Sequence, residues 1–72
     1  RVRVADGAPQ RIGDKGQRYE VRWRKESDPP QTHRVLGWAL KWRGAREMRD
    51  AWWRAPDVDK VWIVDRETGR RL

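Results

Sequence analysis

Six tryptophans carry almost all of the large apolar surface of this 72-residue chain, which has one tyrosine and no phenylalanine. An indole buries a large area but keeps one N–H donor that needs a partner. A core of this size cannot enclose six indoles, because a domain of roughly this length buries only about 60% of its unfolded surface. Some tryptophans therefore form the core, and those left outside are candidates for contact with a partner.

The chain is strongly basic, because 18 basic residues against 11 acidic ones give a net charge of +7 and a pI near 11.0. Arginine outnumbers lysine fourteen to four. GC-rich codon usage accounts for part of that ratio but not for the net charge. The planar guanidinium suits phosphates and carboxylates, and tryptophan beside arginine is typical of nucleic-acid surfaces and of protein interfaces. We therefore expect a binding module of one of these two kinds.

Other classes of function lack their usual residues. The chain has no cysteine and a single histidine, His33, so we expect no disulfide, metal site or cofactor. Ser27 and Thr32 have no constrained base nearby, so we do not expect an enzyme. The longest apolar stretch, 35–40, is too short to cross a membrane, and we expect a cytoplasmic protein without membrane contact. The chain begins with Arg1, which indicates an excerpted or trimmed sequence.

Two segments have the patterns of β-strands. In the YEVRW run within 17–25, apolar residues alternate with charged ones, which predicts a strand with one buried face. The ESDPP sequence at 26–30 predicts a turn, because neither proline has an N–H to donate. The segment 59–66 has apolar residues on both faces, which predicts a central or doubly covered strand. Residues 70–72 are a candidate fourth segment.

The segment 31–42 is compatible with two structures. Its first half suits a second strand that pairs back on the first, but a helix over 33–53 is the alternative. The longer helix would include Gly37 and Gly44, each of which costs up to about 1 kcal/mol relative to alanine. We therefore favour a strand to about residue 38, followed by a helix over 41–55.

The faces of that helix follow from its spacing. Ala45, Met48, Trp52 and Ala55 form one apolar stripe. Trp53 lies at the flank or outside, because adjacent residues of a helix with 3.6 residues per turn point about 100° apart. Trp38 and Trp42, where the strand gives way to the helix, are expected in the core.

The order strand, strand, helix, strand predicts an α+β domain in which one helix packs on a face of a small antiparallel sheet. This single domain would span 17–72. Residues 1–16 contain three glycines and a proline, and we expect them to form a basic arm, in which the alternating 1–4 segment is a candidate N-terminal edge strand.

The run GQRYEVRWRK at 16–25, followed by a turn, a basic second strand and a helix, resembles the arm-type DNA-binding domain at the N-terminus of phage tyrosine integrases. The ESDPP turn and the hydrophobic strand after the helix depart from that pattern. The chain is also similar to short proteins of actinobacterial phages, which implies an origin and no activity. The integrase resemblance implies a basic sheet face in the major groove, with DNA contacts from Arg18, Arg22, Arg24 and Arg34, and with Tyr19, Val21 and Trp23 packing on the helix.

Two functional hypotheses follow. The first is binding of double-stranded DNA through the sheet face and the arm, by Arg11, Lys15, Arg18, Arg22, Arg24, Lys25 and Arg34. The second is a phage-encoded module that binds a host protein, with Trp53 or Trp62 as the anchor and Arg46 and Arg49 at the rim. Open sheet edges and uncovered tryptophan surface also predict a homodimer.

Overall fold

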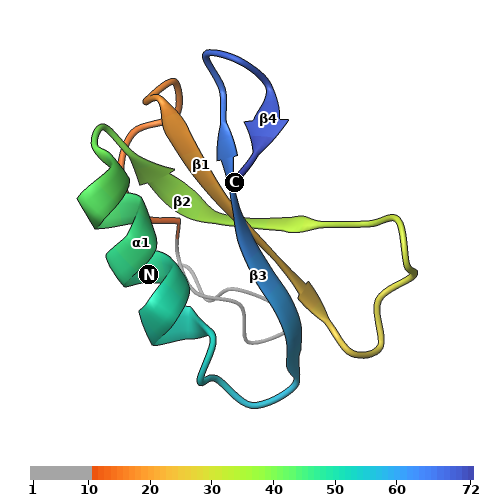
Figure 1. Ribbon diagram of the computed structural model, residues 1–72. Coiled ribbons are helices and arrows are strands. Elements are labelled where there is room, and N and C mark those ends of the chain that lie inside the picture. The colour runs from red at the N-terminus through yellow and green to blue at the C-terminus, as the bar shows by residue number, and fades with distance from the viewer. Residues whose placement is uncertain (1–10) are drawn as a thin grey trace, which may run out of the picture.

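The computed structural model describes residues 11–72 as a four-stranded antiparallel sheet with one helix packed on one face (Figure 1). The strand order is β2-β1-β3-β4, so β1 and β3 are the inner strands. This confirms the predicted α+β class and the fourth segment, whereas the candidate edge strand at 1–4 lies outside the described residues. In chain order the elements are β1 (Tyr19–Lys25), β2 (Arg34–Ala39), α1 (Trp42–Trp52), β3 (Val58–Asp65) and β4 (Arg70–Arg71).

The alternation in β1 sorts its side chains between the two faces of the sheet. Val21 is fully buried and Trp23 is 2% exposed, both on the side that α1 covers. In the pairing with β3, Val21 lies opposite Ile63 and Trp23 lies opposite Val61. Apolar cross-strand pairs therefore line the helix side of the sheet. Leu36, Ala39 and Ala45 complete this core.

α1 covers the core with the stripe that its spacing predicts. Ala45 is fully buried, and Met48 and Trp52 pack against the core. The rings of Trp52 and Trp23 meet edge-on, with centroids 5.1 Å apart, a geometry that aromatic pairs favour. Trp53, the next residue, is 54% exposed, as expected. Trp42 was expected in the core but is 38% exposed at the start of the helix.

The helix is shorter than predicted and ends at Trp52. The residue before a proline avoids the helical conformation, so Pro56 excludes Ala55 from the helix. The Ala55 N–H instead donates to the Trp52 carbonyl at 2.9 Å and closes a turn. Because α1 begins only at Trp42, the strand interpretation of 31–38 is confirmed and the longer helix is wrong.

A β-bulge interrupts the pairing of β1 with β2. Val21 lies opposite Gly37 and Arg22 lies opposite Val35, so Leu36 has no partner across the ladder. In an uninterrupted pairing Leu36 would lie opposite Arg22, on the side away from α1. The bulge brings Leu36 to the helix side, where it is 2% exposed. The bulge that buries Leu36 therefore also moves the residues before it to the opposite side of the sheet.

Ile12 lies along the outer edge of β2. Its N–H donates to the Leu36 carbonyl at 3.1 Å, and its carbonyl accepts from the Trp38 N–H at 2.7 Å. This close approach requires glycine at position 37, because an added Cβ would lie 2.3 Å from the Ile12 carbonyl oxygen. Part of the N-terminal arm thus occupies one edge of the sheet, as a single parallel bridge rather than a strand.

Replacement Gly37→Ala should force Ile12 and β2 apart. We expect the free energy of unfolding to fall by about 1–3 kcal/mol, the usual cost of such an overlap, in chemical denaturation followed by circular dichroism. Ala51→Ser, at an exposed position of α1, is the control and should change the value by less than about 0.5 kcal/mol. A Gly37→Ala protein as stable as the parent would contradict the close approach.

Candidate functional site

The side of the sheet that faces away from α1 carries charged and aromatic side chains, and we call it the open face. In the pairing of β1 with β3, Arg22 lies opposite Trp62 and Arg24 lies opposite Lys60. β4 adds Arg71, opposite Val64. The open face comprises Glu20, Arg22, Arg24, Val35, Trp38, Lys60, Trp62, Val64 and Arg71.

A carboxylate at the β2 side of the open face holds a tryptophan and an arginine. Glu20 is 8% exposed and Trp38 is 6% exposed. The Trp38 Nε1–H donates to Glu20 Oε2 at 3.0 Å, and the Arg22 Nε–H donates to Glu20 Oε1. Burial raises the pKa of Glu20, but the hydrogen bonds from Arg22 and Trp38 outweigh burial and leave that pKa below its ordinary value. Trp38 is therefore buried as expected, although on the side away from α1.

The arginines predicted to contact DNA do not form one row. Arg22 and Arg24 lie on the open face, and the Arg11 guanidinium lies 5.9 Å from the centroid of the Trp38 ring. Arg34 lies on the helix side, opposite Trp23 and 5.5 Å from its ring centroid. The bulge in β2 causes this difference, because an uninterrupted pairing would place Arg34 opposite Arg24 on the open face.

Three further predicted residues also lie apart from the open face. Arg18 precedes β1, and its guanidinium lies 5.1 Å from the centroid of the Tyr19 ring. Lys25 belongs to the helix side by the alternation of β1, opposite Val58. Lys15 is exposed in the turn before β1. The structure thus brings together only Arg11, Arg22 and Arg24 of the seven predicted residues.

Four of the predicted arginines are paired with carboxylates of the same chain. Arg34 donates to both Asp28 oxygens at 2.9 Å, and the Lys25 N–H donates to one of them at 3.0 Å. These bonds, with Arg34 first, hold the pKa of Asp28 far below its ordinary value. The hydrogen bond from Arg18 likewise lowers the pKa of Asp65. The pairs are Arg18–Asp65, Arg22–Glu20, Arg24–Asp59 and Arg34–Asp28.

Sequence reasoning missed two cations of the open face. Lys60 and Arg71 form no ion pair with a carboxylate of residues 11–72. The Arg71 guanidinium lies 4.8 Å from the centroid of the Trp62 ring. The alternation of 59–66 places Lys60 on the same side as Trp62, and this signal would have identified it. The position of Arg71 depends on the pairing of β4 with β3. β4 has only two residues, which are too few to show an alternating pattern in the sequence.

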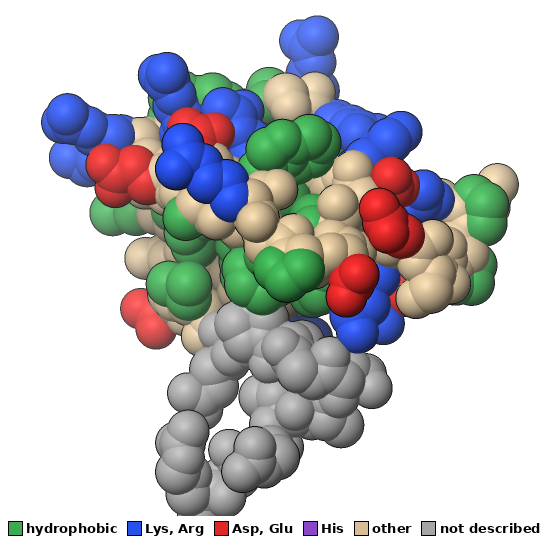
Figure 2. Space-filling view, turned by 90° about the horizontal axis from the view of Figure 1, so that it is seen from below, with side chains coloured by type: hydrophobic (Ala, Val, Ile, Leu, Met, Phe, Trp, Pro, Cys, Tyr) green, Lys and Arg blue, Asp and Glu red, His purple; other side chains and the backbone are tan. Residues whose placement is uncertain are grey.

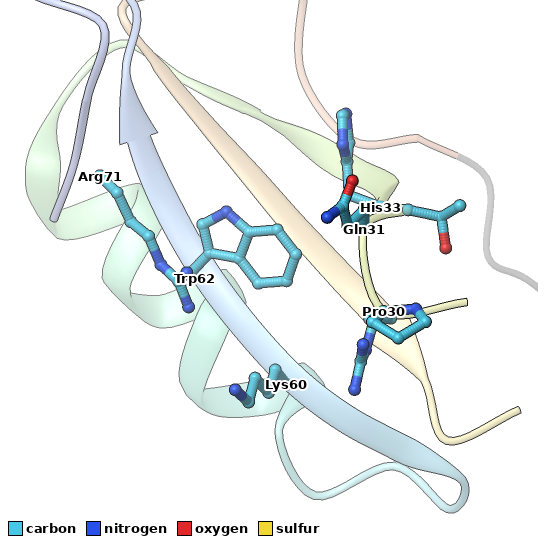
Figure 3. A pocket seen from close by; sticks show the side chains of 8 residues that line it. Pro30, Gln31, His33, Lys60, Trp62 and Arg71 are labelled. Carbon is cyan, nitrogen blue, oxygen red and sulfur yellow. The ribbon is translucent and has the colours of Figure 1, made fainter. Parts of the chain in front are cut away.

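Trp62 forms one wall of a pocket at the end of the open face (Figure 3). The His33 ring approaches the indole edge-on, with centroids 6.5 Å apart. Pro30 and Gln31 lie across the pocket from the indole, while Lys60 lies beside it on the same strand (Figure 3). The lining residues are Arg24, Pro30, Gln31, Thr32, His33, Lys60, Trp62 and Arg71.

The residues of the predicted protein interface separate into two surfaces. Trp53 lines a hollow on the helix side with Arg49, Asp50 and Val61. Asp50 lies 3.2 Å from the Arg49 Nε and 4.0 Å from the Arg46 Nε. Trp62, the other predicted anchor, lies on the open face among cations. Figure 2 shows that basic side chains also project around the outline of the molecule, with hydrophobic side chains between them.

In the described part of the chain, no three histidine, cysteine or acidic side chains gather where they could hold a metal ion. No helix within residues 11–72 has the length and apolar character needed to cross a membrane. Comparison with protein-family models, with curated proteins and with solved structures finds no match to this chain.

Acid should destabilise the domain, because Asp28, Asp65 and Glu20 have lowered pKa values in the folded state. The stabilisation is complete above the ordinary pKa, 3.8 for aspartate, and is lost as the pH falls through the lowered folded-state value. We therefore expect the midpoint of thermal unfolding to decline below about pH 4. Asp28→Asn should lower the midpoint at neutral pH and flatten this decline.

Thermal unfolding followed by circular dichroism between about pH 7 and pH 2 measures both effects. Asp50→Asn is the matched control, because the Asp50 side chain is 58% exposed on α1, and it should leave the profile close to that of the parent. Coinciding profiles for Asp28→Asn and the parent would show that the pair with Arg34 contributes nothing to stability.

Proposed function

We propose that the protein binds double-stranded DNA through the open face. The observation that carries this proposal is the position of Lys60 and Arg71, which flank Trp62 without a carboxylate partner in residues 11–72. Phosphate contacts from lysine and arginine supply most of the affinity of sequence-independent DNA binding. For Arg22 and Arg24 the proposal agrees with the resemblance to the arm-type DNA-binding domain of integrases. It assigns the other DNA contacts to Lys60 and Arg71 instead of Arg18 and Arg34.

Arg22 and Arg24 retain donors for DNA although each has an internal partner. A guanidinium has five N–H donors. Glu20 accepts a hydrogen bond from one nitrogen of Arg22, and Asp59 accepts from two nitrogens of Arg24. These carboxylates hold the guanidinium groups in place, so less side-chain freedom is lost when the remaining donors meet a phosphate or a base edge.

The geometry of the sheet suits a groove of the duplex. The major groove admits a two-stranded β-ribbon, and β1 and β3 present Arg22, Arg24 and Lys60 on neighbouring strands. α1 covers the opposite side of the sheet, and the Ile12 segment lies at the β2 edge. Neither element stands in front of these three cations.

The double variant Lys60→Glu/Arg71→Glu should weaken duplex binding by at least about tenfold, because it removes two phosphate contacts and adds repulsion. The matched control, Arg43→Glu/Arg54→Glu, makes the same change in net charge at exposed positions in and just after α1 and should have a much smaller effect. Fluorescence anisotropy with unrelated duplexes at about 50 mM and about 200 mM salt measures affinity and its salt dependence. Equal losses in both variants, or no binding by the parent at the lower salt, would contradict the proposal.

A second candidate function is protein binding at the helix side, with a second copy of this chain or a host protein as the partner. It is favoured by Trp53, which is 54% exposed beside Arg49 and Asp50, since tryptophan and arginine dominate interface hot spots.

If the partner is a second copy, light scattering at tens of micromolar should give twice the 8.7 kDa chain mass, and Trp53→Ala should restore the single mass. If it is a host protein, capture from a bacterial lysate should survive nuclease treatment and be lost in Trp53→Ala. A parent of single mass that captures nothing after nuclease would remove this candidate.

A further inference from the structure

Trp62 and Trp38, the two tryptophans of the open face, differ in the exposure of the indole and in whether its N–H is hydrogen-bonded. Trp38 is 6% exposed, and its N–H is bonded to Glu20. Trp62 is only partly buried, and its N–H donates to no atom of residues 11–72. Its ring lies toward the pocket that Pro30 and Gln31 border (Figure 3). A partly exposed indole with a free N–H donor therefore borders the pocket, with the Arg71 guanidinium 4.8 Å from its ring centroid.

The wall opposite Trp62 is held in place by the turn that leads into β2. The Thr32 N–H and the Thr32 hydroxyl both donate to the Pro29 carbonyl, at 3.1 Å and 2.8 Å. Asp28 bonds to both Arg34 and the Lys25 N–H. Two prolines restrict the backbone between these bonds. The pocket is thus largely formed before any ligand enters, which lowers the entropy cost of binding.

The chemistry of the lining suits a nucleotide. The indole offers a stacking surface, and Lys60 and Arg71 offer positive charge for a phosphate. The Gln31 amide, which forms no hydrogen bond within residues 11–72, offers a donor and an acceptor for a base edge. Stacking, phosphate pairing and edge hydrogen bonds are the three contacts by which proteins hold single-stranded nucleotides.

We propose that the Trp62 pocket takes one unpaired DNA base, which stacks on the indole while Lys60 or Arg71 holds an adjoining phosphate. A base inside a duplex exposes only its edges in the grooves, so stacking on Trp62 requires a base outside the helix, as in a single-stranded extension. The inference rests on the proposed function, because the adjoining duplex would lie on the open face. The protein would then prefer a duplex with an extension to a blunt one.

The test compares three DNAs: a blunt duplex, the same duplex with a short single-stranded extension, and the same duplex with an abasic extension. The abasic extension has the phosphates of the second DNA but no base to stack. By anisotropy at one salt concentration, we expect the extension with bases to bind at least about fivefold more tightly than the abasic one, the lower end of what stacking one base contributes.

Variants of Trp62 test whether this preference arises from the pocket. Trp62→Leu should abolish the ratio between the two extensions, because an aliphatic side chain offers no ring for a base to stack on. Trp62→Phe should keep part of the ratio. Trp53→Leu, at the exposed tryptophan on the other side of the sheet, should keep all of it. If Trp62→Leu fails to fold by circular dichroism, Gln31→Ala at the exposed opposite wall replaces it and should reduce the ratio.

The outcomes separate the two proposals. If both extensions bind equally and the blunt duplex also binds, the proposal that the Trp62 pocket takes a base is overturned. The proposed duplex binding is then unaffected. Preference for the extension with bases, without binding of the blunt duplex, supports the pocket and overturns the duplex proposal. Absence of binding to all three DNAs overturns both. A preference that persists in Trp62→Leu overturns the assignment to this pocket.

Discussion

The packing of β1 against α1 decides what the rest of the molecule can present. Val21 and Trp23 take the helix side, and the alternation of the strand then forces Glu20, Arg22 and Arg24 to the other side. In residues 11–72 no second helix covers that side. The two indoles there are accompanied by polar partners instead, Glu20 for Trp38 and Arg71 for Trp62. A tryptophan-rich chain thereby keeps one face of its sheet polar.

Arginine has two different uses in this structure. Arg34 donates to Asp28, in the turn after β1, and Arg18 donates to Asp65, at the end of β3. These pairs connect the two ends of β1 to β2 and β3. Lys60 and Arg71 have no such carboxylate partner in the described residues, and Arg71 contacts the Trp62 ring instead. Counting basic residues along the sequence does not distinguish these uses, because pairing is decided by carboxylates that lie up to 47 positions away.

Most of the secondary structure was predictable because local periods specify it. The alternation in β1 and the stripe from Ala45 to Trp52 each depend on residues within one element. The side on which Arg34 lies is different, because a bulge is a property of two paired strands and depends on the burial that Leu36 gains. The same limit applies to Arg71, whose place comes from pairing with β3, and to Trp62, since the pattern of β3 does not indicate which of its faces α1 covers.

The bulge in β2 also selects one pairing of the hairpin over its nearest competitor. The straight ladder would move Leu36 out of the core and set Arg34 opposite Arg24, where two like charges would face each other across the strands. Both hydrophobic and electrostatic free energies therefore disfavour the slipped register. An arginine that lies outside the open face therefore helps to specify the register of the β1–β2 hairpin.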